Sequence, residues 1–401
     1  KNRVAGYLSV WFSSRGVDPV IVNWLTGSEV SFFEAGMYYA QYPVDKLQGD
    51  YDCYAMHLLA MINSGKPLNI PQTRKGLIGS QLQLHEGVVA KLFAELHRRA
   101  RSLAEASNTS WEEFHNSITL YTLLVLNFSS GHRPVNLPYQ TITSVDAVDG
   151  GMFINDKAMG GSTFGRQIVL PSLAVEQYVH YIKHLQAFNA YSQAVSDSMA
   201  QQIGGVLRGD LPLFFFIKDG ECNTVSVSSM DVRMSEILPL PMNVNRHFMK
   251  TQLVQFGVQS AQVDAWMGHA SFGHDAFETY SGLSLHAMSG VASEIDGYLR
   301  GTQGIKPLQS FTGFVLTDKS LSPVDNDWRQ LSRQQRSLSR AKVIKKNVDT
   351  LIRMYLTGLT KLQPNTTHYD QGKTAVLDHI GEKYKRLSEL RIARNYFSSW
   401  V

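Results

Sequence analysis

Three side chains between residues 243 and 280 have the chemistry that cutting and rejoining a phosphodiester requires. Arg246, His269 and Tyr280 follow one another in this stretch. A tyrosine can form a covalent intermediate with a phosphoryl group, although its pKa of about 10 means that the phenol must lose its proton during the attack. An arginine stays charged at any working pH and can hold phosphate oxygens by paired hydrogen bonds. These residue types predict phosphodiester transfer without a metal ion.

The elements that carry these side chains are predicted to be two helices, each followed by a turn. Apolar residues alternate with polar ones around Gly257, and Trp266-Met267 leads into Gly268-His269. Such a pattern is typical of a helix, a turn, a second helix and a second turn. The segment after the second turn carries Tyr280.

The order of these residues resembles that of the tyrosine recombinases, the phage integrase family. The C-terminal half of that family typically has Arg-His, then Gly-His, then a nucleophilic tyrosine. The resemblance implies that Tyr280 is the nucleophile, with Tyr298 as the fallback, although the interval from His269 to Tyr280 is slightly longer than is typical. It also implies a site-specific recombinase or integrase that cuts one strand at a time, holds a 3′-phosphotyrosyl intermediate and works as a tetramer on two DNA duplexes.

Arg133 and Lys157 stand where the family has two more catalytic residues. Arg133 follows Gly131-His132 at the end of an apolar helix, which matches the Gly-x-Arg context of the family's first arginine, although Pro134 is less usual there. Lys157 lies between strand signals, where the resemblance implies a general acid for the leaving 5′ oxygen. The structural alternatives are an arginine that caps a helix end and an ordinary turn lysine.

One position departs from the usual His-x-x-Arg motif of the family. Asn243 stands three residues before Arg246, where a histidine is usual. Asparagine donates and accepts hydrogen bonds but takes no proton at neutral pH. Asn243 can orient the phosphate, and His269 becomes the next candidate for the proton acceptor. The other histidines nearby are His132, His247 and His274. We expect His247 to be a buried structural residue.

The remaining patterns predict a mainly α-helical protein with a small antiparallel β-sheet. Ser110, followed three residues later by Glu113, is a capping-box pattern that starts a very apolar helix. The run 211–217 is predicted to be a buried strand that enters a turn. Helical patterns lie at 80–101, 110–128, 173–188 and 284–298, and strand signals lie at 141–145, 152–155 and 166–171.

We expect three parts along the 401 residues, in line with a length that favours two or three domains. Residues 1–75 form a helical segment, rich in aromatic residues, that could belong to a DNA core-binding domain. Residues 76–305 form the recombinase-like catalytic domain. Residues 306–401 form a basic helical extension.

Positive charge is concentrated in that extension. The whole chain has a formal net charge of +4, whereas residues 311–401 contain 8 Lys and 8 Arg against 6 Asp and 2 Glu. Two long helical patterns are expected there, at 327–361 and 373–397. A basic helix can contact DNA phosphates or pair subunits, and the sequence leaves both roles open beside that of a solvated face.

Composition narrows the class of protein further. No apolar run is long enough for a membrane span, and Cys53 and Cys222 have no metal-binding spacing, which favours a reducing cytosol. No P-loop and no cluster of carboxylates is found, so neither ATP nor a metal ion is expected as a cofactor. The resemblance to the recombinases implies a bacterial, nucleoid-associated cytoplasmic protein of a mobile genetic element that binds double-stranded DNA.

Two alternatives remain from the sequence. A type IB topoisomerase or a telomere resolvase would keep the chemistry and change the product. A non-catalytic DNA-binding protein could use the same scaffold. The chain begins at Lys1 rather than at Met, and we expect its natural start to lie upstream.

Overall fold

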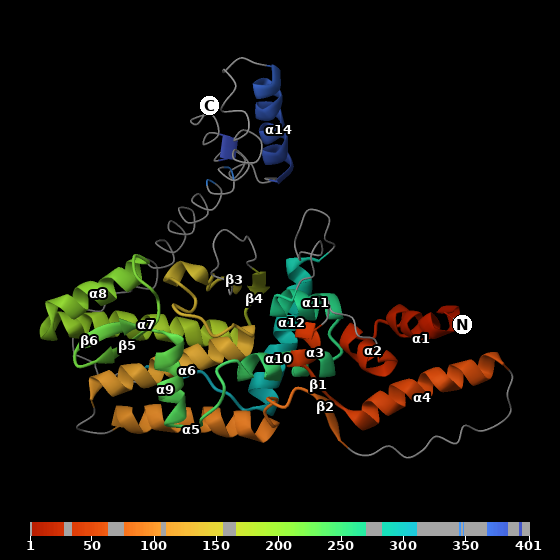
Figure 1. The fold of residues 1–401 in the computed structure, drawn as a ribbon. Helices are drawn as coiled ribbons and strands as arrows, with labels where there is room; N and C mark the ends of the chain where they lie inside the picture. Colours follow the sequence, from red (N-terminus) through yellow and green to blue (C-terminus); the bar gives the residue numbers. More distant parts are fainter. Residues whose placement is uncertain are drawn as a thin grey trace. The chain divides into compact units, whose positions relative to one another are not determined.

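A computed structural model gives the fold and divides the chain into two compact units, Lys1–Thr317 and Asp318–Val401 (Figure 1). The residues that it describes are 2–27, 34–62, 76–105, 110–154, 166–269, 283–310 and 367–383, together with residues 345, 348, 393 and 394. The described part is mainly α-helical, and its strands form two-stranded antiparallel sheets. The predicted fold class, mainly helical with a little antiparallel sheet, is therefore confirmed.

The N-terminal elements are helices joined by one short strand pair. They are α1 Asn2–Ser14, α2 Pro19–Thr26, α3 Glu34–Tyr39, β1 Gln41–Pro43, α4 Val44–Met61 and β2 Leu77–Gly79. The carboxylate of Asp18 accepts the Val20 N–H at 2.8 Å and Pro19 occupies the first turn, which is how α2 starts. Trp11, Phe12 and Tyr54 lie in a small aromatic core here, as expected from the aromatic composition.

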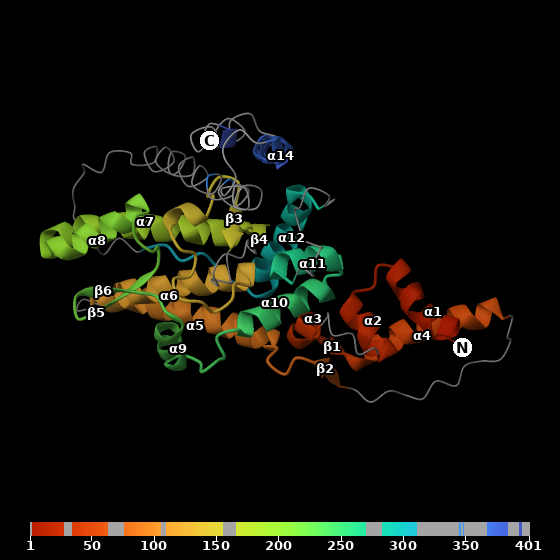
Figure 2. The ribbon, with the colours of Figure 1, turned by 45° about the horizontal axis from the view of Figure 1, so that its top comes forward.

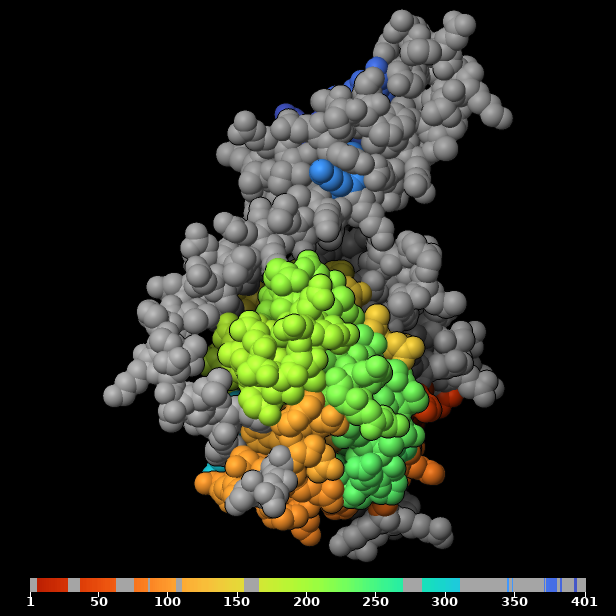
Figure 3. Space-filling view, turned by 90° about the vertical axis from the view of Figure 1, so that its left-hand side faces the viewer, coloured from red at the N-terminus to blue at the C-terminus, as the bar shows by residue number. Residues whose placement is uncertain are grey.

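A bundle of four long helices forms the body of the first unit. They are α5 Glu86–Glu105, α6 Trp111–Ser130, α7 Ser172–Val195 and α8 Asp197–Arg208. α6 is buried on nearly every side and packs against α5 and α7 (Figures 1 and 2). A helix that is apolar all round belongs inside a core. In Figure 3, the yellow-green of α7 and α8, the green that follows them and the orange of α5 and α6 form one continuous surface.

Two hairpins flank the bundle. They are β3 Gly151–Ile154 with β4 Arg166–Val169, and β5 Phe215–Lys218 with β6 Glu221–Thr224. Asp219 and Gly220 both have positive φ, 55° and 80°, which is the two-residue turn that suits a tight hairpin. The predicted buried strand that enters a turn is confirmed, although only its second half is paired.

The predicted strand at 141–145 was wrong. Residues Ile142–Ser144 form a 3₁₀ turn, and only Val145 bridges to Met152 in the β3 strand. The Ser144 N–H donates to the Thr141 carbonyl at 3.0 Å, and the Thr141 N–H donates back to the Ser144 hydroxyl at 3.3 Å. Such local bonds of a serine compete with a strand ladder.

The remaining helices of the first unit carry most of the predicted site. They are α9 Val227–Ser235, α10 Val244–Gln255, α11 Ser260–Met267, α12 Leu285–Gly297 and a π-helical turn Tyr298–Thr302. Gly257 and Gly268 have φ of 72° and 66° in the two turns around α11. Glycine takes this left-handed backbone without a steric penalty, which explains why the turns lie at these residues. The predicted order of helix, turn, helix and turn is therefore confirmed.

The start of α5 differs from the prediction, whereas α6 starts at the predicted residue without the predicted capping bonds. α5 begins at Glu86 rather than at residue 80 and continues to Glu105. Ser110 is at the N-cap of α6, but its side chain makes no capping hydrogen bond, so the predicted capping box was wrong. The carboxylate of Glu112 instead accepts the Gly220 N–H at 2.7 Å. The start of α6 is therefore tied to the β5–β6 turn by a tertiary contact.

In the second unit the structure describes α14, Thr367–Lys383, with Val376 and Ile380 buried. This helix begins before the predicted start at residue 373. The predicted helix at 327–361 lies outside the described residues except for Lys345 and Val348, which are helical. No helix in the described ranges of either unit has both the length and the hydropathy of a membrane span.

Candidate functional site

Arg246 joins the ends of two helices at the centre of the candidate site. It lies in the first turn of α10 and is fully buried. Its Nη1 donates to the Gly131 carbonyl at 2.6 Å, and its Nη2 donates to the Met267 carbonyl at 2.8 Å. These carbonyls lie at the C-termini of α6 and α11, where helices have unpaired acceptors and favour a cation.

His269 contacts the same guanidinium directly. Arg246 Nη2 lies 2.8 Å from His269 Nε2. A guanidinium only donates, so Nε2 accepts, and the neutral imidazole carries its proton on Nδ1. Burial, with the charges of Arg246 and Lys250 next, lowers the pKa of His269 to about 2. In this state the imidazole is neutral and weakly basic, which does not suit a proton acceptor.

The Nδ1 atom of His269 has an unusual environment. It is buried and makes no hydrogen bond to any residue in the described ranges. A buried donor without a partner costs free energy, and an acceptor brought into the site would recover it. The tautomer therefore presents His269 as a hydrogen-bond donor beside a buried arginine.

A second buried arginine, Arg166, supports the same helix ends. From the first residue of β4 it donates to the Ser130 carbonyl at 2.9 Å and to the Gly131 carbonyl at 3.1 Å, and it also bonds the Trp266 carbonyl. Arg166 and Arg246 thus share one acceptor, Gly131 O. Arg166 was not predicted from the sequence, since an arginine at the start of a strand carries no mark of burial.

Lys250 adds a third buried cation, one turn after Arg246 on α10. Its side chain is 1% exposed, and its Nζ lies 3.1 Å from Asp264 Oδ1 on α11. Burial raises the pKa of the Asp264 carboxyl, and the nearby Lys250 opposes that shift. The pair fastens α10 to α11, and the charge of Lys250 is close enough to help lower the pKa of His269.

Arg133 and Asn243 line one open hollow beside this cluster. The hollow has a volume of about 440 Å³ and is also lined by Tyr39, Pro134, Val135 and Met242. Arg133 comes two residues after the α6 C-cap Gly131, and Asn243 is the N-cap residue of α10. The structure therefore brings four of the predicted residues, Arg133, Asn243, Arg246 and His269, to the ends of α6, α10 and α11.

Tyr39, at the end of α3, lines the hollow and also contacts Arg246 and His269. Its ring stacks on the His269 imidazole with centroids 5.2 Å apart at 18°. Arg246 Cζ lies 4.9 Å from the same ring centroid, and the His247 ring lies at 4.6 Å. Tyr39 was not predicted from the sequence, because it is one aromatic residue among many near the N-terminus.

The prediction that His247 is a buried structural histidine is confirmed. Its Nε2 accepts from Asn243 Nδ2 at 3.3 Å, which leaves its Nδ1 to donate to the Ser80 hydroxyl at 2.6 Å. Burial, then the charge of Arg246, lowers the pKa of His247 to about 4. His132 is also buried, and its Nδ1 bonds the Arg133 carbonyl at 2.6 Å. Neither ring serves the hollow directly.

Several predicted residues fall outside the part of the chain that the structure describes. They are Lys157, His274 and Tyr280. Tyr298, the fallback nucleophile, packs its ring against Phe248 and Phe256 with centroids 5.9 and 5.1 Å apart. Its site role stays a prediction, as do those of Lys157 and Tyr280.

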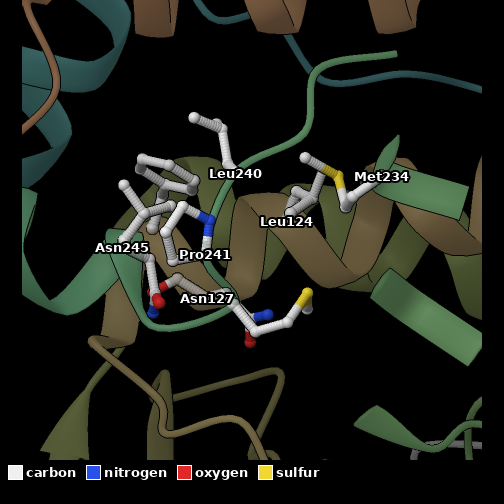
Figure 4. A pocket seen from close by; sticks show the side chains of 9 residues that line it. Leu124, Asn127, Met234, Leu240, Pro241 and Asn245 are labelled. Carbon is white, nitrogen blue, oxygen red and sulfur yellow. The ribbon is translucent and has the colours of Figure 1, made fainter. Parts of the chain in front are cut away.

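A second pocket nearby is too small for a substrate. It has a volume of about 20 Å³, room for about one water molecule. Figure 4 shows mainly apolar side chains around it, among them Leu124, Met234, Leu240 and Pro241. It lies beside the start of α10 and is a packing defect rather than a binding site.

No protein-family model, no curated protein and no solved structure matches this chain. Among the residues that the structure describes, no group of three or more His, Cys, Asp or Glu side chains could hold a metal ion. The function must therefore be inferred from the arginines, the histidine and the hollow themselves.

Proposed function

We propose that this chain is a DNA strand transferase of the tyrosine-recombinase type, a site-specific recombinase or integrase. It would cut and rejoin double-stranded DNA through a 3′-phosphotyrosyl intermediate. The observation that carries the proposal is the 2.8 Å contact between Arg246 Nη2 and His269 Nε2, across 23 residues of sequence. Both residues were predicted from the motif to belong to one site, and the fold brings them into contact.

The surroundings of this pair suit an anionic transition state. Arg133 and Asn243 line the adjacent hollow and can hold non-bridging phosphate oxygens. Arg246 and Lys250 supply buried positive charge close by, where such charge has a stronger effect than in water. His269 can donate from Nδ1 to a phosphate oxygen.

The reaction in this proposal is an in-line exchange of P–O bonds. The Tyr280 phenol loses its proton and its oxygen attacks phosphorus, while the bond from phosphorus to the 5′ oxygen breaks. Lys157 gives the leaving 5′ oxygen a proton. Rejoining reverses these steps, and the phosphotyrosyl link preserves the bond energy, so ATP hydrolysis is not required. The group that accepts the phenol proton stays unassigned, because Asn243 cannot and neutral His269 is a poor base.

The same proposal covers partners and location. A tetramer on two DNA duplexes would exchange strands, and the basic C-terminal extension would contact phosphates or a neighbouring subunit. A bacterial, nucleoid-associated protein of a mobile element fits this activity.

One observation favours a second candidate, DNA binding without strand transfer. Arg246 is fully buried, and both of its terminal nitrogens donate to groups of the protein. In a non-catalytic scaffold the arginine would only hold the ends of α6 and α11 together. A catalytic Arg246 requires that binding of the DNA phosphate exposes or displaces part of this arrangement.

Covalent trapping separates the two candidates. The full chain is incubated without added metal with phosphorothiolate-containing duplexes from its own genomic neighbourhood, and adducts are separated on a denaturing gel. We expect a 3′-linked protein–DNA adduct that is absent in Tyr280→Phe. An adduct that survives this change assigns the nucleophile to Tyr298. If the chain binds a duplex but forms no adduct, the non-catalytic candidate is correct. Relaxed or hairpin products without joined sites would indicate a topoisomerase or a telomere resolvase.

A further inference from the structure

Tyr39, a residue of the N-terminal segment, packs its ring against the contacting side chains of Arg246 and His269. Its ring lies almost parallel to the imidazole, at 5.2 Å and 18°, and the guanidinium carbon of Arg246 lies 4.9 Å from its centroid. Within the described residues, the Tyr39 side chain makes ring contacts and no hydrogen bond. The ring rather than the hydroxyl is therefore the part that acts on the site.

The backbone at Tyr39 and two residues after it is fixed to α10. Thr251 Oγ1 donates to the Tyr39 carbonyl at 3.5 Å and accepts the Gln41 N–H at 3.1 Å. α3 and β1 both contact α10 (Figure 1). Because these bonds hold the main chain, the Tyr39 ring is presented to His269 in a defined position rather than by chance contact of a mobile side chain.

The β1–β2 strand pair adds a second anchor. The Ser80 N–H donates to the Ala40 carbonyl at 2.7 Å, and the Ser80 hydroxyl bonds His247 Nδ1 at 2.6 Å. A Cβ atom on Gly79 would collide with the Ala40 oxygen, so this close approach requires glycine. Ala40, Gly79 and Ser80 thus converge next to Tyr39.

The position of the imidazole depends on a flat neighbour. A histidine ring rotates easily about its terminal side-chain bond, and rotation would move Nε2 away from Arg246. A parallel aromatic ring restricts that rotation and excludes water from one face of the imidazole. With the ring in place, Nε2 stays on Arg246 and Nδ1 stays the donor.

We propose that Tyr39 is a positioning residue, through which the N-terminal segment holds the His269 imidazole against Arg246 and completes the phosphate-binding site. The contribution to catalysis rests on the proposed strand transfer, whereas the effect on the imidazole does not. Tyr39 also lines the hollow, but in this proposal its ring acts on the reaction through His269 and not on the reacting atoms.

Nitrogen NMR of histidine rings in the full chain tests the structural part. In wild type and Tyr39→Phe, we expect His269 to carry its proton on Nδ1 and to stay neutral down to the acid limit of the folded state. In Tyr39→Ala, water reaches the ring, so we expect mixed tautomers and titration at a higher pH. Tyr39→Leu keeps apolar bulk without a flat ring and replaces the alanine variant if that one does not fold. An unchanged His269 in the folded Ala or Leu variant would overturn the proposal.

The rate of adduct formation tests the catalytic part. At saturating DNA, we expect Tyr39→Ala to react about 10- to 100-fold more slowly than wild type, as misplaced reacting groups do, with unchanged DNA affinity. Tyr39→Phe should restore the wild-type rate. Tyr51→Ala is the matched control, because Tyr51 lies on α4 of the same segment and is 44% exposed.

Other outcomes are equally decisive. A Tyr39→Ala variant that reacts as fast as wild type contradicts positioning, and one that reacts faster shows that the ring blocks the phosphate. If wild type forms no adduct, the strand-transfer proposal fails, and the NMR result still decides whether Tyr39 positions His269.

Discussion

At the scale of single residues, two left-handed glycines determine how closely the site can be packed. Gly131 and Gly268 end α6 and α11 with φ of 62° and 66°. Their turns expose the carbonyls that Arg246 and Arg166 bind. A side chain at either glycine would meet both a strained backbone and an occupied space.

Gly268→Ala should destabilise the protein more than Gly257→Ala. Both positions have positive φ, which costs an L-residue about 1–2 kcal/mol. A Cβ at Gly268 would lie 2.9 Å from Arg166 Cδ, whereas one at Gly257 would meet nothing within 4 Å. Urea unfolding measures how much each variant lowers the free energy of unfolding relative to wild type. The difference between these two losses gives the cost of the contact with Arg166. Equal losses would show that Arg166 moves aside without cost.

At the scale of elements, a chain of buried histidines connects α6 and α7 with the segment after α12. His115 Nε2 bonds the Phe215 carbonyl at 3.1 Å, so its Nδ1 accepts from His184 Nε2 at 3.0 Å. His184 Nδ1 then accepts from the Ser310 hydroxyl at 2.9 Å. Each ring is neutral, with its proton on Nε2. This order follows because a carbonyl only accepts.

The hydrogen-bonded pair His115 and His184 should make the fold sensitive to acid. Burial lowers the pKa of His115 to about 3 and that of His184 well below its ordinary value. Below about pH 6.5 the unfolded chain therefore binds more protons than the folded chain. Each of the two histidines then removes about 1.4 kcal/mol of stability per pH unit of further acidification. The stabilisation is complete above about pH 6.5 and is lost as the pH falls towards about 3.

Urea unfolding between about pH 7.5 and about pH 4.5 measures this effect. We expect His184→Gln to be less stable at the upper pH but to lose stability less steeply on acidification than wild type. The exposed His286 provides the control, and His286→Gln should keep the wild-type dependence on pH. A His184→Gln slope equal to that of wild type would contradict the assignment of the buried pair.

At the scale of the whole molecule, the net positive charge and the predicted chemistry belong to different units. The second unit contains all 16 Lys and Arg side chains of residues 311–401, whereas the Arg246 cluster belongs to the first unit. If the second unit contacts DNA phosphates, it raises affinity without reading sequence.

A salt titration tests this division. Arg329, Arg333, Arg336 and Arg340 are spaced three or four residues apart in the helical pattern expected at 327–361. We expect replacement of all four by glutamine to weaken DNA binding and to flatten its dependence on salt, by about 0.9 in log–log slope for each phosphate that the variant no longer neutralises. Fluorescence anisotropy at several salt concentrations gives the slope. Arg98 and Arg101, exposed on α5 of the first unit, provide the matched control when changed to glutamine. An unchanged slope, together with a smaller assembly in sedimentation, would assign the extension to subunit pairing.

The sequence by itself determined the helices, their turns and the residue types of the site. Periodicity marked α10 and α11, and Gly257 and Gly268 marked their ends, because few other residues take a left-handed backbone. It did not determine the start of α5, the bonds that hold the start of α6 or the turn at 141–145, where tertiary and local polar bonds replaced the expected pattern. It indicated Arg246 and His269 as members of one site but not their contact.

Only the tertiary structure decided what surrounds those residues. Arg166 lies 80 positions before Arg246, and Tyr39 lies 230 positions before His269. No periodicity relates such distant segments. Burial removes water from His269 and places cations beside it, which sets its protonation and makes it a donor. Residue type is a local property that a sequence states directly. Proximity and dielectric environment arise only when distant segments pack together.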